Sequence, residues 1–274
     1  MNYRVLALDL DGTTLTSDHR ILPPVREAIA SIRDRATVLL VTGRHHTAAR
    51  PYHHELGLST PIICCNGTYV YDYRTESVLA ADAIGHDVAR DFLALAAGHG
   101  LNLVMYVTDR MVYSASRPID YMQVLERWAQ QFPATIRPSI ARVASFDDEL
   151  ASQSHVWKFV VEGDIDGVEA FARLPWVQEH FNGEKSWRNR IDFARRGNTK
   201  GSRLAAFLAQ HAIDPAEVVA IGDNHNDISM LQLAGLGVAM ANADDAVKQA
   251  ADVVTEETND GLGIREVLHR YFGA

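Results

Sequence analysis

Short apolar runs that end in polar residues recur near the start of the chain. Residues 5–8 (Val-Leu-Ala-Leu) stop at Asp9, and residues 38–41 (Val-Leu-Leu-Val) stop at Thr42. Uninterrupted apolar runs of this length are typical of strands that are covered on both faces of a parallel sheet. The pattern predicts a βαβαβ unit, with strands at 3–9, 37–41 and 61–65 and helices at 23–35 and 45–57.

The same alternation returns after residue 200. An apolar run at residues 218–221 ends at the polar cluster Gly222-Asp223-Asn224-His225-Asn226-Asp227. The predicted elements are helices at 200–211, 226–233, 243–250 and 260–272, and strands at 218–222, 237–240 and 252–254. Both ends of the chain therefore predict one α/β domain with a doubly wound parallel sheet, split by an insertion.

The middle of the chain has a different pattern. Residues 68–73 and 77–79 predict an exposed hairpin after the Asn66-Gly67 turn. The next predicted elements are helices at 85–99, 119–131 and 165–173, strands at 101–107, 111–113, 140–145 and 156–161, and two strands flanking Asn182-Gly183, a typical hairpin signal. We predict an α+β cap domain at 83–190 with its own antiparallel sheet. It is inserted into a core domain formed by 1–82 and 191–274, through two linkers that permit hinge motion.

Two carboxylates stand at the end of the first predicted strand. In Asp9-Leu10-Asp11-Gly12-Thr13, strand periodicity places Asp9 and Asp11 on one side, at the edge where open α/β sheets bind their ligands. One carboxylate can attack a substrate while its neighbour moves protons, provided that a cation offsets their charge. Asp, Gly and Thr also form ordinary turns and helix caps, so this segment alone does not decide the function.

Three further segments are suited to phosphate. Thr42-Gly43-Arg44 brings a hydroxyl and backbone N–H groups to a loop before a helix. Lys200 stands where an amphipathic helix begins, and Asp223 follows another buried strand. These four motifs, in this order, resemble those of the haloacid dehalogenase (HAD) superfamily of phosphotransferases.

The resemblance extends over essentially the whole chain to the Cof-type hydrolases, HAD phosphatases with a large α/β cap inserted after the third core strand. Within that family the chain is most similar to the bacterial pyridoxal phosphate phosphatases, on segments 41–46, 64–69, 105–107, 156–159 and 223–231. Thr14 stands where the family usually has leucine, a departure that we expect to affect packing alone.

The resemblance implies a role for each motif residue. Asp9 is the nucleophile that forms an aspartyl phosphate, and Asp11 is the general acid and base. Mg²⁺ is held by Asp9, Asp223 and the backbone carbonyl of Asp11. Asp227 either orients Lys200 or caps a helix start. The expected phosphate ligands are the Leu10 N–H, Thr42, Gly43, Lys200 and Asn226.

Other side chains are weaker candidates for contact with the organic part of a substrate. Aromatic residues at such positions more often belong to the core. The pairs His45-His46 and His53-His54 lack the spacing of a zinc site. The candidate contacts are Arg44, His45, Asn66, Tyr106, Trp157, Lys158 and Trp187.

The composition of the chain restricts the kinds of partner that the protein is expected to bind. The net charge of −9, without a cluster of Lys and Arg, argues against nucleic acid, and no apolar run is long enough to span a membrane. The adjacent Cys64 and Cys65 are expected to be reduced core residues. These features predict a cytoplasmic protein that acts on a small phosphorylated metabolite. They do not fix the oligomeric state, for which a monomer is favoured.

The favoured interpretation is an enzyme, a Mg²⁺-dependent phosphatase of small phosphomonoesters, with pyridoxal 5′-phosphate as the best single substrate. A sugar-phosphate phosphatase or a phosphotransferase would share all four motifs. A receiver-like module, phosphorylated on Asp9 for signalling, is the non-catalytic alternative. Such a module needs neither Asp11 nor a cap of about a hundred residues, which argues against it.

Overall fold

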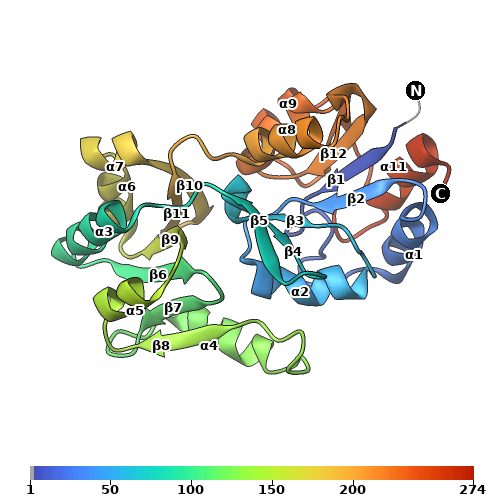
Figure 1. Ribbon diagram of the computed structural model, residues 1–274. Coiled ribbons are helices and arrows are strands. Elements are labelled where there is room, and N and C mark those ends of the chain that lie inside the picture. Colours follow the sequence, from blue (N-terminus) through green and yellow to red (C-terminus); the bar gives the residue numbers. More distant parts are fainter. Residues whose placement is uncertain (1–2) are drawn as a thin grey trace. The chain divides into compact units, whose positions relative to one another are not determined.

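The computed structural model describes residues 3–274 and divides into two compact units (Figure 1). The core unit consists of the chain up to Gly43, Tyr52–Leu79 and Thr199–Ala274. The inserted unit consists of Arg44–Pro51 and Ala80–Asn198. Both ends of the chain therefore contribute to the core unit, as its alternating pattern predicts.

The core unit is built on a parallel sheet of five strands in the order β14-β13-β12-β1-β2. An isolated parallel bridge between Val41 and Ile63 extends it toward β3. The predicted α/β fold with a doubly wound parallel sheet is confirmed. The strands are β1 (Val5–Leu8), β2 (Thr37–Leu40), β3 (Ile62–Cys64), β12 (Val218–Gly222), β13 (Leu236–Ala239) and β14 (Val253–Val254).

Helices cover both faces of this sheet (Figure 1). On one side α1 (Pro23–Ile32) packs against α11 (Gly263–Phe272), and on the other α8 (Lys200–Gln210) packs against α9 (Ile228–Leu233). The predicted helix at 226–233 begins with a 3₁₀ turn, η3 (His225–Asp227). The unit also contains α10 (Asp245–Ala250), the 3₁₀ turn η2 (Pro215–Glu217) and the second part of α2 (His46–Glu55).

A small sheet, β3-β4-β5, follows the third core strand. It contains the predicted hairpin, formed by β4 (Tyr69–Asp72) and β5 (Ser77–Ala81). The hairpin is exposed only along β5, because β4 is mostly buried. Between β3 and β4, the 3₁₀ turn η1 (Cys65–Gly67) holds Asn66 in a left-handed conformation, with φ of 56°. Cys64 and Cys65 are buried free thiols, as expected.

The inserted unit has a six-stranded sheet in the order β10-β11-β9-β6-β7-β8. Neighbouring strands are antiparallel except β7 and β8, which are parallel. The strands are β6 (Asn102–Val107), β7 (Met111–Ser114), β8 (Ile140–Val143), β9 (Val156–Glu162), β10 (Phe181–Trp187) and β11 (Arg190–Arg195).

Five helices complete the inserted unit. One face of its sheet packs against α3 (His86–Gly98), α6 (Ile165–Ala172) and α7 (Pro175–His180), around stacked rings of Phe92 and Phe159. The opposite face meets α4 (Asp120–Ala129), where the Tyr113 hydroxyl donates to Glu126. The first face is lined by aromatic rings, whereas the second, here called the polar face, combines polar side chains such as Lys158 with apolar ones such as Val104.

Two predictions for this unit are wrong. Asn182-Gly183 lies inside β10 and is not a turn, and the hairpin closes instead between Trp187 and Arg190. A Cβ atom at Gly183 would lie 3.1 Å from the Phe193 ring, so the missing side chain makes room for that ring and not for a turn. The short helices α5 (Phe146–Ser152) and α7 were also missed.

The units divide after Leu79 and after Asn198, whereas the predicted domain boundaries follow residues 82 and 190. The second boundary lies later in the chain than predicted. This is because β11 pairs with β9 and β10, so the whole strand belongs to the inserted sheet. The assignment of 83–190 as a cap for specificity stays a prediction.

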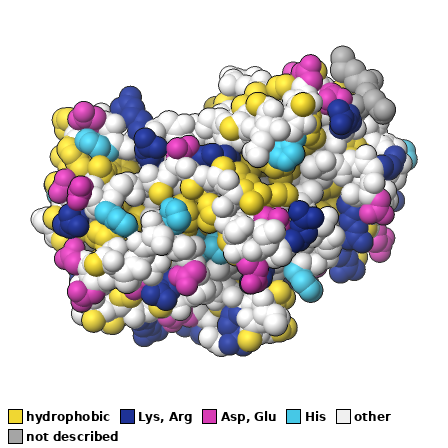
Figure 2. Space-filling model, viewed as in Figure 1, with side chains coloured by type: hydrophobic (Ala, Val, Ile, Leu, Met, Phe, Trp, Pro, Cys, Tyr) yellow, Lys and Arg dark blue, Asp and Glu magenta, His cyan; other side chains and the backbone are white. Residues whose placement is uncertain are grey.

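Figure 2 shows charged side chains of both signs interspersed over the visible face. Within residues 3–274, no helix combines the length and the apolar character that crossing a membrane requires.

Candidate active site

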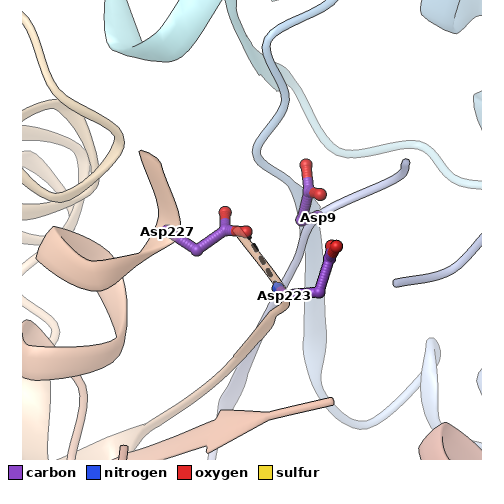
Figure 3. Close-up of side chains that lie close together, drawn as sticks. All are labelled: Asp9, Asp223 and Asp227. Atoms are coloured by element: carbon purple, nitrogen blue, oxygen red, sulfur yellow. Dashed lines mark hydrogen bonds between the residues drawn. The ribbon is translucent and has the colours of Figure 1, made fainter. Parts of the chain in front are cut away.

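Three carboxylates converge at the carboxyl end of the core sheet (Figure 3). Asp9 follows β1 and Asp223 follows β12, and these two strands are paired in register from Val5 to Leu8. Asp227 comes from η3, and one oxygen of each carboxylate lies within 4.8 Å of the others. Asp9 and Asp223, the acids predicted at the ends of two strands, therefore lie close together because those strands are adjacent.

Lys200 lies between two of these carboxylates. Its Nζ donates to Asp9 Oδ1 and to Asp227 Oδ1, both at 2.6 Å, and its side chain is fully buried. The start of α8 fixes this position, because the Thr199 side chain caps the helix by accepting from the Ser202 N–H. The first residue of a capped helix thus places one cation against the candidate nucleophile.

Asp227 makes the contacts of both roles that the sequence left open, which are to orient Lys200 and to cap a helix start. Its Oδ2 accepts the N–H groups of Asp223 and Asn224 at 3.0 Å each, which closes the capping box of η3 (Figure 3). Its Oδ1 accepts from Lys200. With both oxygens engaged, Asp227 fixes the orientation of Lys200 and of the backbone that carries Asp223.

The acids perturb one another's protonation. Burial and the neighbouring Asp227, Asp223 and Asp11 raise the pKa of Asp9 well above its ordinary value, although Lys200 lowers it. Burial, Asp227 and Asp11 raise the pKa of Asp223 to about 7, against lowering by Thr13 and Lys200. Burial lowers the pKa of Lys200, but Asp227 and Asp9 outweigh it and the pKa is raised. Lys200 is therefore protonated, but its single positive charge does not balance the negative charges of the surrounding carboxylates.

The excess of negative charge in this group of carboxylates favours a bound cation. Asp227 is already engaged by Lys200 and two N–H groups, so Asp9 and Asp223 are the carboxylates best placed to hold one. Oxygen donors of this kind suit a hard divalent ion. The Asp11 carboxylate is not part of the group. It is 46% exposed, and its Oδ1 lies 3.6 Å from His19 Nδ1.

Two threonines that were not predicted to take part in the site support the acids. Thr13 Oγ1 donates to Asp223 Oδ1 at 2.7 Å, and Thr14 Oγ1 donates to the Asp9 carbonyl at 2.5 Å. The expectation that Thr14 affects packing alone is therefore wrong. Gly12 allows the close approach, because its φ is +75° and a Cβ would lie 2.3 Å from Asp223.

The predicted phosphate loop is linked to the acidic end of β12 through Asn66. The Asn66 N–H donates to the Thr42 carbonyl at 3.1 Å, and Asn66 Oδ1 accepts from Asn226 Nδ2 at 3.1 Å. A Cβ on Gly43 would lie 2.8 Å from the same Oδ1, so glycine is needed there. Asn226 Oδ1 is buried without a hydrogen-bond partner among the described residues. The Leu10 carbonyl, next to Asp9, accepts from the N–H groups of Thr13 and Leu15.

The remaining candidates belong to the inserted unit. The His45 ring bonds through Nε2 to the Val107 carbonyl at 2.8 Å and through Nδ1 to Thr47. Burial and Lys158 lower the pKa of His45 to about 4, despite its bond to the Val107 carbonyl, so the ring is neutral. Trp157 is buried, Trp187 is 62% exposed, and Arg44 lies over the Trp128 ring. Tyr106 and Lys158 lie together on the polar face of the inserted sheet.

An acid after one strand, a second acid after its neighbour and a buried lysine between carboxylates form the arrangement that the resemblance to the haloacid dehalogenase superfamily predicts. The chain matches the model of the haloacid dehalogenase-like hydrolases over residues 6–268 and belongs to that family. The predicted membership is confirmed, and the protein is an enzyme of the phosphatase class.

Individual relatives and a solved structure support the same family assignment. The chain is 42% identical to pyridoxal phosphate phosphatase YbhA of Escherichia coli (strain K12), over 96% of this chain and 97% of that protein. It is 26% identical to a 5-amino-6-(5-phospho-D-ribitylamino)uracil phosphatase, YitU of Bacillus subtilis (strain 168), over 98% and 97%. A haloacid dehalogenase-like hydrolase from Bacteroides thetaiotaomicron has a similar structure, with a TM-score of 0.85 and 27% identity over 98% and 99% of the two chains.

Removal of the Lys200 charge is expected to destabilise the core unit. Lys200→Met leaves Asp9 and Asp227 buried without their shared cation, and breaking a buried ion pair on one side costs about 3 kcal/mol of unfolding free energy. Denaturant unfolding of the metal-free protein measures this loss. Lys248→Met on α10, which is partly exposed, is the control and should change stability by less than about 0.5 kcal/mol. Equal stability of the two variants would contradict the bridging role.

The raised pKa of Asp223 predicts a pH dependence of stability without metal. Its pKa is 3.8 ordinarily and about 7 in the fold, so between these values the folded state binds more protons than the unfolded state. The contribution of Asp223 to stability therefore falls as the pH rises through this window. Asp223→Asn abolishes the effect and keeps an acceptor for Thr13. We expect the variant's advantage over wild type, measured by unfolding in EDTA, to grow by roughly 1 kcal/mol per pH unit between about pH 4 and pH 7. A constant difference would show that Asp223 is not perturbed.

Proposed function

We propose that the protein is a Mg²⁺-dependent phosphatase that hydrolyses small phosphomonoesters through an aspartyl phosphate on Asp9. The observation that carries this proposal is the contact between Lys200 and Asp9, which fixes a strand-end carboxylate beside a permanent positive charge. In-line phosphoryl transfer needs little more than a positioned nucleophile and neutralisation of the phosphate oxygens.

The residues divide the reaction between them. Asp9 attacks phosphorus, and the bond to the ester oxygen breaks as the aspartyl phosphate forms. Asp11 protonates the departing alkoxide and then takes a proton from the water that attacks the aspartyl phosphate. Its partial exposure suits a group that must exchange protons with both leaving group and water. The Leu10 N–H, Thr42, Gly43, Lys200 and Asn226 hold the phosphate oxygens.

Mg²⁺ would be held by Asp9, Asp223 and the backbone carbonyl of Asp11, and would supply charge neutralisation for the phosphate. The raised pKa values of Asp9 and Asp223 support this assignment, because a cation there favours the ionised carboxylates. Asp227 supports Lys200 and does not enter the ligand set, since its two oxygens are engaged.

Pyridoxal 5′-phosphate is the proposed substrate, supported by the 42% identity to YbhA over nearly the whole of both chains. In this proposal residues 83–190 act as a cap that selects the organic part of the substrate. The alternatives are a sugar-phosphate phosphatase or phosphotransferase and a receiver-like phospho-acceptor. A small phosphorylated metabolite is the partner in each enzymatic case, and the monomeric state and cytoplasmic location stay predictions.

A substrate panel with purified protein tests this proposal. With Mg²⁺ we expect kcat/KM for pyridoxal 5′-phosphate to exceed that for glucose 6-phosphate by at least about tenfold, because discrimination comes from contacts to the leaving group. Chelation with EDTA should abolish turnover, and added Mg²⁺ should restore it. A higher kcat/KM for the sugar phosphate would favour the first alternative. Phosphoryl transfer to added alcohols in preference to water would favour a phosphotransferase.

Substitution of the two strand-end acids separates their roles. Asp9→Asn keeps the shape but cannot form the acyl phosphate, so turnover should fall by at least about a thousandfold. Asp11→Asn should still form the aspartyl phosphate from an activated substrate and should hydrolyse it slowly. Rapid quench with acid, followed by mass spectrometry of the Asp9 peptide, detects the intermediate. Substantial turnover by Asp9→Asn would rule out the nucleophile assignment, and a stable phosphorylated wild type would favour the receiver-like module.

A further inference from the structure

The turn that follows β1 in the core unit carries the proposed acid and base. It runs from Asp11 to Leu15, which form an isolated parallel bridge, and the Leu15 N–H donates back to the Leu10 carbonyl at 2.8 Å. Within the turn, Gly12 lies so close to Asp223 that a Cβ atom would be 2.3 Å from its carboxylate. A shift of this turn would therefore displace Asp11 relative to the carboxylates of the site.

Two asparagines outside the four motifs bind the carbonyl groups of this turn. Asn242 Nδ2 donates to the Gly12 carbonyl at 2.8 Å. Asn259 Nδ2 donates to the Leu15 carbonyl, also at 2.8 Å. The asparagines are joined to each other, because the Asn259 N–H donates to Asn242 Oδ1 at 3.0 Å. A backbone N–H can only donate and a carbonyl can only accept, so these contacts fix which end of the Asn242 amide faces the turn. We call this pair the asparagine clamp.

The clamp comes from the loops after β13 and β14, the two strands at one edge of the core sheet. Asn242 lies between β13 and α10, and Asn259 lies between β14 and α11. Asp260, the next residue, accepts from the N–H and from the hydroxyl of Ser17, at 2.8 Å each. The two loops therefore hold the segment from Gly12 to Ser17 from outside.

The positions of these asparagines favour a role in orientation over one in stability alone. Asn242 is exposed and Asn259 is half-buried, and hydrogen bonds that compete with water add little to stability. The Asp11 side chain is itself 46% exposed, so the main chain of the turn largely determines where its carboxylate lies. A general acid has to lie within hydrogen-bond reach of the leaving oxygen, and misplacement by about 1 Å can cost about a hundredfold in rate.

We propose that Asn242 and Asn259 are positioning residues, which hold the turn so that Asp11 can protonate the leaving oxygen. The inference rests on the proposed function and adds two residues to it. As the bond between phosphorus and the ester oxygen breaks, that oxygen takes the Asp11 proton and Asp11 becomes a carboxylate. The clamp acts on this step through the main chain, because its two amides bind the carbonyls of Gly12 and Leu15.

Two aryl phosphates of similar shape test the clamp. 4-Nitrophenolate leaves readily as an anion, whereas phenolate is a poorer leaving group that needs a proton from a general acid. The quantity measured is the ratio of kcat/KM for phenyl phosphate to that for 4-nitrophenyl phosphate. Both values come from one sample of protein, so a loss of folded enzyme cancels in the ratio.

Asn242→Ala and Asn259→Ala should each lower this ratio about tenfold, a part of the roughly 10²–10⁴-fold that a positioned acid contributes. The double variant should be little worse than either single one, because the two residues act as a unit. Asn182→Ala is the matched control, since its side chain donates to the Asn198 carbonyl at 2.9 Å within the inserted unit. The control should keep the ratio within about twofold of wild type. An unchanged ratio in the clamp variants, or an equal fall in the control, would overturn the inference. If Asn242→Ala does not fold, Asn259→Ala decides the question.

Asp11→Asn separates this inference from the proposed function. This variant has no acid to position, so its ratio should be low, and adding Asn242→Ala should lower it no further. A low ratio in Asp11→Asn with an unchanged ratio in the clamp variants would overturn the inference and leave the phosphatase proposal intact. A further fall in the combined variant would overturn it too, because the clamp would then act on another group. An unchanged ratio in Asp11→Asn would contradict the acid role of Asp11 and overturn the inference with it.

Discussion

The arrangement of the active site depends on one buried contact, the bridge from Lys200 to Asp9 and Asp227. In the proposed function Asp9 attacks a phosphate, so its carboxylate has to be ionised in a place with little water, and burial alone opposes this. Lys200 offsets part of that cost at a distance of 2.6 Å from each acid. In the proposed function, Mg²⁺ would offset the remaining excess of negative charge on Asp9, Asp223 and Asp11. Lys200 and the metal ion would then have complementary roles, because Lys200 alone does not balance the acids.

The parallel order of the core sheet explains why the sequence revealed this site. Parallel strands end at one edge, so an acid after β1 and an acid after β12 must meet if those strands are neighbours. The apolar runs before Asp9, Thr42 and Asp223 predicted three of those strands, and the start of a helix at Lys200 predicted the cation. The family resemblance supplied the order of the motifs. The local sequence therefore predicted where each motif residue lies along its strand or helix. The strand order, which brings β12 beside β1, is known only from the structure.

What the sequence did not predict depends on contacts between distant segments. Gly183 follows Asn182 as in a typical turn, yet it pairs with Phe193 on the neighbouring strand, where a Cβ atom would crowd the ring. Thr14 looked like a packing variant because its partner, the Asp9 carbonyl, accepts from it only after the chain turns back at Gly12. Asn66 was expected as a candidate substrate contact, whereas its link from the Thr42 carbonyl to Asn226 depends on a left-handed turn in η1.

The two units place different demands on their polar residues. In the core unit the acids near Asp9 have hydrogen-bond partners within the protein, as Asp227 has Lys200 and Asp223 has Thr13. In the inserted unit the charges are paired, but the Tyr121 hydroxyl and Arg190 Nε are buried and unsatisfied within the described residues. In the proposed function the phosphate is the same in every phosphomonoester, so one set of motif residues can serve all of them. The organic part differs, so discrimination between substrates has to come from contacts outside the four motifs.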